Sequence, residues 1–202
     1  DYGVGNLNSI KNMLKKAGAG EVVITSDLKT IERADKLILP GVGHFDFGMT
    51  KLKETGLIPL LNKKVLEDKI PILGICLGAQ LMTKRSDEGE VPGLGWVDGE
   101  TITFNKSKLP NGYKIPHMGW NFVTPEKEVA LMEDMPDESR FYFVHSFHLE
   151  MKNPEDIWLT TDYGYNFCAA FHTDNIYACQ FHPEKSHKFG MKLLQNFTEA
   201  TA

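Results

Sequence analysis

The pattern of apolar and polar residues in the first half of the chain alternates between strand-like runs and helical spacing. Short apolar runs bounded by breaking residues predict buried strands, and an apolar residue at every third or fourth position predicts helices between them. The predicted strands are residues 21–26, 36–41 and 70–75, and the predicted helices are residues 7–17, 46–68 and 78–85. Strands that alternate with helices favour a parallel sheet covered by helices on both faces.

The second half of the chain has a different pattern, rich in β-branched and aromatic residues. Four such stretches predict added antiparallel strands, and the Asp174-Asn175 pair suits a hairpin turn. The stretches read WVDGETITF, GYKIPHMGWNFV, RFYFVHSFHLE and NFCAAFHTDNIYACQFH. A last helix is predicted over 187–201, with Phe189, Leu193, Leu194 and Phe197 on one face.

These patterns predict a fold class and a domain organisation. Without internal repeats or linkers, residues 1–202 are expected to form a single domain with an α/β fold. Its sheet is expected to be open and mainly parallel, with helices on both faces plus the added antiparallel strands. The Gly-rich DYGVGN at the start resembles a turn that follows a strand, so a further strand is expected upstream of Asp1.

Charge and cysteine content exclude several classes of function. The formal net charge of −5 argues against binding to nucleic acid or to anionic membranes, because both need a basic surface. No apolar run approaches the roughly 18 residues that a membrane helix needs. The three cysteines form no Cys-x-x-Cys pair, which favours a reduced, cytoplasmic setting. No metal site or cofactor is expected.

One cysteine has the surroundings of a nucleophile. Lone cysteines in apolar runs are most often core residues, and we interpret Cys168 and Cys179 in that way. Cys76, however, lies in GICLG, the pattern of a nucleophile elbow with cysteine in the serine position. Such a turn between strand and helix exposes the sulfur and places it at the positive end of the helix dipole, where a thiolate is favoured.

A cysteine nucleophile needs a base and a group that orients the base. His182 follows the last strand-like run, and Glu184 lies two residues later. In an extended segment both side chains point the same way, so Glu184 can hold one imidazole nitrogen while the other faces Cys76. A His-x-Glu pair alone is weak, and it gains weight only beside the elbow.

Acyl transfer also needs donors for the oxyanion. The turn PGVGHFDFG follows the strand 36–41 and is expected at the carboxyl edge of the sheet. We expect one donor to be the backbone N–H of Leu77 and the other that of Val42 or Gly43. A dinucleotide-binding turn is excluded here, because the third glycine of that motif is absent.

Several motifs together resemble a known enzyme family. LPGVG, GICLGAQ and FHPE are similar to those of the triad-type, class I glutamine amidotransferases. DYGVGNLNSI, EVPGLGW, PHMGWN, FYFVHSFH and QFHPEKS resemble more narrowly the glutaminase subunits of imidazole glycerol phosphate synthase, in histidine biosynthesis. The resemblance covers essentially the whole chain, and it departs at His187, where the family often has glycine.

The resemblance implies roles for further residues. Cys76 would attack L-glutamine, His182 would move the proton, and Glu184 would orient the imidazole. The residues that would line the glutamine pocket are Gly43, Gln80, Glu88, Ser146 and Phe147. A (β/α)₈ cyclase would be the partner in a heterodimer and use the ammonia, and it would contact PHMGWN, which comprises Pro116, His117, Met118, Gly119, Trp120 and Asn121. Trp120 is the candidate anchor.

Three alternatives stay open at this point. The chain could be a glutaminase that serves another synthase, against which PHMGWN and DYGVGN argue. It could be a free-standing cysteine hydrolase of γ-glutamyl substrates, which would use the same three residues. It could also be a catalytically silent binding module, although all three candidate residues are present.

Overall fold

The computed structural model describes residues 1–200, in which a mixed sheet has parallel strands at one end. Strand β2 (Ile72–Cys76) pairs in parallel with β1 (Leu37–Gly41) on one side and with β10 (Ile176–Cys179) on the other. The sheet then continues through antiparallel strands in the order β10, β9 (Asn166–Thr173), β7 (Phe147–Met151) and β3 (Gly99–Thr103). This arrangement confirms the α/β class with added antiparallel strands, although only β1, β2 and β10, at one end of the sheet, pair in parallel.

Two smaller pieces complete the β-structure. Strand β8 (Ile157–Asp162) pairs with β9 and with the short β5 (Thr124–Pro125). Strands β4 (His117–Phe122) and β6 (Arg140–His145) form a separate two-stranded antiparallel sheet. Short 3-10 turns, η2 (Ala130–Met132) and η3 (Pro154–Asp156), join these strands.

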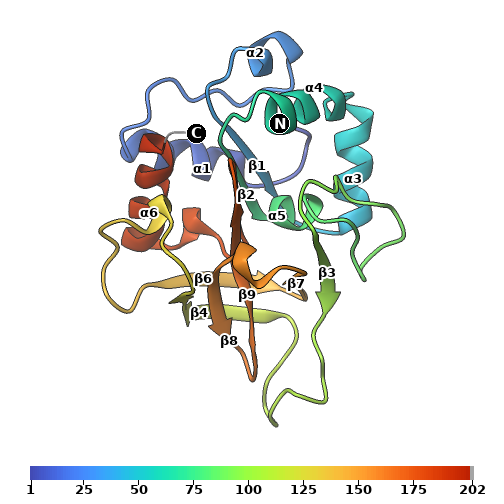
Figure 1. The fold of residues 1–202 in the computed structure, drawn as a ribbon, viewed down its shortest axis with the longest axis vertical. Helices are drawn as coiled ribbons and strands as arrows, with labels where there is room; N and C mark the ends of the chain where they lie inside the picture. The colour runs from blue at the N-terminus through green and yellow to red at the C-terminus, as the bar shows by residue number, and fades with distance from the viewer. Residues whose placement is uncertain (201–202) are drawn as a thin grey trace.

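Helices cover both faces of the parallel strands, and each face has its own hydrophobic core. Helices α3 (Phe45–Glu54) and α5 (Leu77–Leu81) pack on one face, and α1 (Leu7–Lys16) and α6 (His187–Glu199) pack on the other (Figure 1). Neighbouring residues of β2 face different cores, since Ile72 belongs to one core and Leu73 to the other. Both faces are therefore dry, which explains why the strand is uninterruptedly apolar.

The remaining helices lie around β1 and α3. They are α2 (Leu28–Glu32), α4 (Ile58–Asn62) and a π-helical turn, η1 (Lys63–Glu67). The helical patterns predicted between 46 and 68 thus correspond to three consecutive elements, α3, α4 and η1. No helix among the described residues is long and apolar enough to cross a bilayer.

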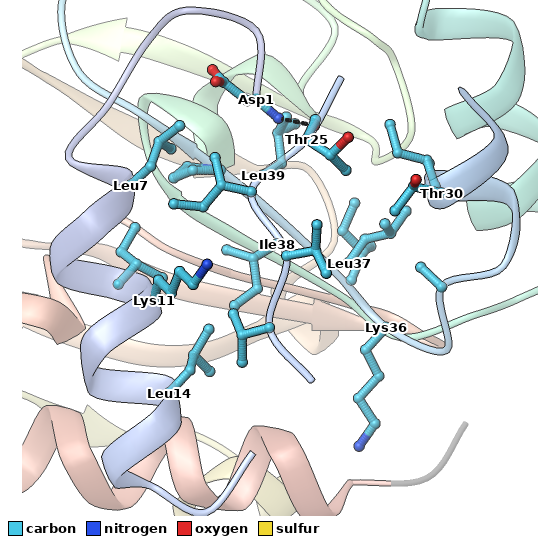
Figure 2. A pocket seen from close by; sticks show the side chains of 18 of the residues that line it. Asp1, Leu7, Lys11, Leu14, Thr25, Thr30, Lys36, Leu37, Ile38 and Leu39 are labelled. Carbon is cyan, nitrogen blue, oxygen red and sulfur yellow. Dashed lines mark hydrogen bonds between the residues drawn. The ribbon is translucent and has the colours of Figure 1, made fainter. Parts of the chain in front are cut away.

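The predicted strand at 21–26 is wrong. These residues pair with no strand in the described part of the chain. A groove of about 830 Å³ has residues 19–25 in its lining together with residues of α1 and β1, among them Leu7, Leu14 and Ile38 (Figure 2). An apolar run becomes a strand only beside a backbone partner, and here the Asp1 amino group donating to the Thr25 carbonyl is the visible link. The strand expected upstream of Asp1 stays a prediction.

One other prediction needs correction. The helix predicted over 78–85 ends at Leu81, because the chain turns to bond with β3 through the Lys84 N–H and the Gly99 carbonyl. The strand-like stretch RFYFVHSFHLE divides at Ser146 into β6 and β7, which belong to different sheets. The hairpin at Asp174-Asn175 is confirmed, with Ile176 opposite Thr173.

Glycines on both sides of Cys76 let α5 pack directly on the strands. A Cβ at Gly78 would lie 1.7 Å from the Leu39 carbonyl oxygen, and one at Gly74 would lie 2.9 Å from Ala79 Cα. Any side chain at these positions would push the helix away from the sheet. The two glycines around Cys76 therefore serve close approach of strand and helix.

The Gly78→Ala substitution should lower the free energy of unfolding by about 3 kcal/mol, because the added methyl group meets backbone rather than a flexible side chain. Urea unfolding followed by circular dichroism measures this change. Gly20→Ala is the matched control, since a Cβ there meets nothing within 4 Å, and its unfolding free energy should be unchanged or slightly higher. Equal effects of the two substitutions would contradict the packing described here.

Candidate functional site

Cys76 occupies a strained bend between β2 and α5. It is the last residue of the strand and the N-cap of the helix, with φ 52° and ψ −111°, a backbone conformation that residues with a Cβ rarely adopt. The strand, turn and helix expected around the residue are all present. Strain of this kind persists only where the surrounding packing imposes it, and it is common at functional sites. Cys76 is only 7% exposed and belongs to one of the two hydrophobic cores, so the exposed sulfur expected at such a turn is not observed, because the surrounding core packing covers it.

His182 and Glu184 form a buried pair beside this bend. The Nδ1 atom of His182 lies 2.8 Å from Oε1 of Glu184, so the N–H at Nδ1 donates to the carboxylate. This bond leaves Nε2, which is buried and has no hydrogen-bond partner in the described structure. The predicted contact is therefore present, but its cause differs: Glu184 lies in the 3-10 turn η4 (Pro183–Lys185) rather than in an extended segment.

The backbone around His182 is held at both ends. Its N–H donates to the Tyr142 carbonyl at 2.9 Å, and the Ser186 hydroxyl donates to its carbonyl oxygen at 2.6 Å. Ser186 Oγ also accepts the Tyr142 N–H at 3.0 Å. The imidazole is thus fixed in position before any substrate arrives.

Cys76 and Glu184 set the electrostatics of His182. Burial alone would lower the pKa of the imidazole, but the hydrogen bond to Glu184 and the charge interactions with Cys76 and Glu184 outweigh it and raise the pKa to about 9. A protonated imidazole between a sulfur and a carboxylate is the charge distribution that a cysteine nucleophile requires.

The loop after β1 reaches the same edge of the sheet as the bend. Gly41, the last residue of β1, is the register partner of Cys76, so Val42 and Gly43 follow directly beside it. Gly43 has φ +104°. The Glu88 carboxylate accepts the Phe45 N–H at 2.8 Å and so ties its own segment to this loop. The loop is therefore in place to supply backbone donors, and the assignment to Val42 or Gly43 with Leu77 stays a prediction.

Gln80 lies one helical turn beyond Cys76 and is almost fully buried. Its amide donates to the Phe147 carbonyl at 3.3 Å and to Oε1 of Gln180 at 3.1 Å. Gln80 and Phe147, two predicted pocket residues, are therefore in contact. Ser146, between β6 and β7, adjoins Phe147 and is half-buried. Glu88 lies across the loop, 2.8 Å from the Phe45 N–H, and contacts neither of them in the described hydrogen bonds.

Sequence reasoning missed Gln180. Its side chain is completely buried, and its Nε2 lies 3.8 Å from the Cys76 sulfur. The sequence signal was its position two residues before His182, because side chains two residues apart in an extended segment point to the same side.

The predicted partner segment presents an apolar stripe. Along β4, Met118, Trp120 and Phe122 are exposed, at 61%, 40% and 52%, whereas the intervening residues face inward. The Trp120 ring stacks on His187 at 5.5 Å between ring centroids, and Arg140 lies 5.8 Å above the ring. Within the described chain nothing covers the outer side of this stripe.

The other two cysteines lie in the core as predicted. Burial raises the pKa of Cys168 to about 12 and that of Cys179 well above its ordinary value. Both thiols donate to backbone carbonyls, among them Ala170 and Phe181. Neither is accessible as a nucleophile. The described residues hold no group of three or more side chains arranged to bind a metal.

Removing the sulfur should lower the pKa of His182. With its folded pKa raised above the ordinary 6.5 to about 9, the pair stabilises the fold fully below pH 6.5, and this contribution is lost as pH rises through 9. In Cys76→Ala the pKa should fall by about one unit or more, as an NMR titration of the imidazole would measure. Cys168→Ala is the control and should leave the titration unchanged. An unaltered His182 titration in Cys76→Ala would show that the sulfur does not act on the ring.

Comparison with known proteins assigns the chain. A model of the family "Glutamine amidotransferase class-I" matches residues 1–200. Imidazole glycerol phosphate synthase subunit HisH 2 of Methanococcus maripaludis is 54% identical over 197 residues, which cover 98% of this chain and 96% of the relative. The subunit HisH 2 of Pseudomonas aeruginosa is 48% identical over 199 residues, with 98% and 96% covered.

Solved structures agree on the fold. A putative GMP synthase protein of Thermoplasma acidophilum superimposes with a TM-score of 0.70 at 23% identity, covering 98% of this chain and 89% of the other. A structure titled as a glutamine amidotransferase gives a TM-score of 0.70 at 18% identity, with 95% of each chain covered. The chain therefore belongs to the class I glutamine amidotransferase family and, within it, to the glutaminase subunits of imidazole glycerol phosphate synthase.

Proposed function

We propose that the chain hydrolyses L-glutamine to glutamate and ammonia through a thioester on Cys76. The observation that carries this proposal is the strained bend that presents the Cys76 sulfur beside the buried His182–Glu184 pair. The family assignment supports the reaction, and this geometry supports the roles proposed for the three residues.

In the first half of the reaction the sulfur attacks the side-chain carbonyl carbon of glutamine. The C–N bond breaks after His182 Nε2 delivers its proton to the departing nitrogen, so that ammonia leaves and a thioester remains. Glu184 accepts from Nδ1 and thereby keeps Nε2 directed at the reacting atoms.

In the second half a water molecule attacks the thioester, and the neutral imidazole takes its proton. The C–S bond breaks, glutamate leaves, and the sulfur and imidazole return to their charged pair. Both tetrahedral intermediates carry an oxyanion, which the Leu77 N–H and a donor from Val42 or Gly43 would stabilise. Loss of one such donor costs about 10²–10³ in rate.

Glutamine would bind between the loop after β1 and the Gln80–Phe147 contact. Gly43, Gln80, Glu88, Ser146 and Phe147 are the residues proposed to line this site. Gln80 and Phe147 touch each other, and Glu88 is tied to the loop that carries Gly43. The residues proposed to line the pocket come from four separate segments, namely the loop after β1, helix α5, the segment of Glu88 and the junction of β6 and β7.

The ammonia would pass to a (β/α)₈ cyclase, which forms imidazole glycerol phosphate and AICAR in histidine biosynthesis. The relatives are named as subunits of imidazole glycerol phosphate synthase, which supports a heterodimer. We propose that the cyclase covers β4 and the preceding Pro116, because the exposed stripe of Met118, Trp120 and Phe122 has the aromatic character of interface anchors. We also propose that the protein works in the cytoplasm and that residues 1–202 form a single domain.

Cys76→Ser should reduce glutamate release by about 10⁴-fold in a mixture of the chain with a histidine-pathway cyclase, because the hydroxyl is a far weaker nucleophile at this site. Glutamate release and complex formation by size-exclusion chromatography are measured together. Cys168→Ala, which changes a buried cysteine away from the bend, should retain the activity within a few-fold.

Each other outcome rejects part of the proposal. Full activity in Cys76→Ser rejects the thioester. Absence of a complex and of stimulation rejects the cyclase as partner. Steady turnover of γ-glutamyl peptides by the isolated chain would favour the free-standing hydrolase instead.

A further inference from the structure

A continuous line of hydrogen bonds runs from strand β4 to the Cys76 sulfur. His117 on β4 bonds to His145 at 3.0 Å between Nδ1 and Nε2. His145 Nδ1 lies 2.7 Å from the Phe147 carbonyl oxygen. That oxygen also accepts from Gln80, which bonds in turn to Gln180, and Gln180 Nε2 faces the sulfur at 3.8 Å. We call these residues, from His117 to Cys76, the relay.

Each hydrogen bond in the relay has only one possible direction. The Phe147 carbonyl can only accept, so His145 donates from Nδ1 and must accept at Nε2 from the Nδ1–H of His117. The Gln80 amide nitrogen donates to two oxygens, which leaves the Gln180 amide nitrogen to face the sulfur. Burial lowers the pKa of His117 to about 4 and that of His145 well below its ordinary value, so both rings are neutral, as this pattern requires.

Burial makes the relay sensitive to any break. His117, His145, Gln80 and Gln180 are all less than 7% exposed. Water cannot replace a lost partner at such depth, so each unpaired group costs about 1–3 kcal/mol. The His117 ring is also clamped by stacking on Tyr163 and Phe143, with centroids 4.0 and 4.9 Å away. A shift of β4 must therefore move His145 and the Phe147 carbonyl with it.

The relay begins on the strand that carries the apolar stripe. Side chains alternate along β4, so Met118 and Trp120 face outward while His117, next to Met118, faces inward. We propose that the relay positions the Cys76 sulfur and couples its reactivity to the placement of β4, with His117, His145 and Gln180 as positioning residues. The cyclase as the partner that contacts β4 rests on the proposed function. The coupling between β4 and Cys76 within the chain does not depend on it.

At the sulfur the relay acts through a single donor. The N–H of Gln180 stabilises the anionic sulfur and sets the direction in which its remaining lone pairs point. The thiolate is the form that electrophiles alkylate, so loss of this donor slows alkylation by lowering the fraction of the sulfur present as thiolate. A hydrogen bond to a charged group contributes about 1.5–3 kcal/mol, which corresponds to roughly tenfold or more in that fraction.

The test is the rate at which iodoacetamide alkylates Cys76 in the full chain at neutral pH, with the modified residue mapped by mass spectrometry. Mapping is needed because all three cysteines are buried, with Cys76 7%, Cys168 4% and Cys179 0% exposed. Gln180→Met keeps the shape without the donor and should slow alkylation roughly tenfold. His117→Phe keeps the stacked ring without the donor and should slow it roughly threefold or more. His117→Asn retains a donor at the δ position, so its alkylation rate should stay near that of the unsubstituted chain.

The matched control is Thr161→Val. Thr161 is buried and donates to the Phe122 carbonyl of β4 at 2.7 Å, so this variant removes a bond to the same strand outside the relay. Its alkylation rate should remain within about twofold of the unsubstituted chain. If His117→Phe does not fold, His117→Gln replaces it, because its amide nitrogen lies at the wrong position to reach His145.

The decisive comparison is the double variant Gln180→Met with His117→Phe. Once the last link is absent, His117→Phe should have no further effect on the alkylation rate. An equal effect of His117→Phe in both backgrounds, or none in the unsubstituted background, would overturn the relay. Failure of the proposed function has a separate sign, namely intact coupling in this assay without glutamate release in the cyclase mixture.

Discussion

The bend at Cys76 is the constraint on which the site depends. A residue with a Cβ rarely combines φ 52° with ψ −111°, and such a conformation persists only where the surrounding packing imposes it. Here β2 is fixed by parallel partners on both sides, and α5 is pressed against the Leu39 carbonyl, where only glycine fits at position 78. Strand and helix are thus each held in place by their own contacts, and Cys76 joins them with a strained backbone conformation.

The same pairing of strands brings the two halves of the chain together at this bend. Cys179 of β10 is the register partner of Ile75, so the residues that follow β10 pass directly beside Cys76. Gln180 and His182 arrive there as a result of sheet register, although about one hundred residues separate them from the nucleophile in the sequence. On the other side of β2, the register of Gly41 with Cys76 delivers the loop of Val42 and Gly43 in the same manner. One strand therefore organises nucleophile, base and expected oxyanion donors.

The elements that could be predicted from the sequence are those that the local residue pattern determines. The helix at 7–17, the strand before Cys76 and the hairpin at Asp174-Asn175 each follow from spacing or turn chemistry, and each is present. The strand expected at 21–26 is absent because strand formation also needs a neighbouring backbone, which periodicity does not report. Strand β8 was missed although its β-branched and aromatic residues, IWLTTD, carried the usual signal.

For the site, residue types were predictable but the contacts between distant residues were not. The His182–Glu184 contact was expected from an extended segment and is made instead by a 3-10 turn, which spacing alone cannot distinguish. Gln180 escaped notice because a buried glutamine has no recognisable motif, and its role depends on a contact with Cys76 across two strands. The division of one apolar stretch at Ser146, which places Phe147 against Gln80, likewise depends on pairing in two different sheets.

The most direct test of this account is a crystal structure of the chain after reaction with a chloroketone analogue of glutamine. We expect a covalent bond to the Cys76 sulfur, a Cys76 φ still in the left-handed region, and the ketone oxygen facing the Leu77 N–H and the loop at Val42 and Gly43. His182 Nε2 should lie within hydrogen-bond distance of the adduct. An adduct on Cys168 or Cys179, or a relaxed Cys76 backbone with His182 turned away, would contradict it.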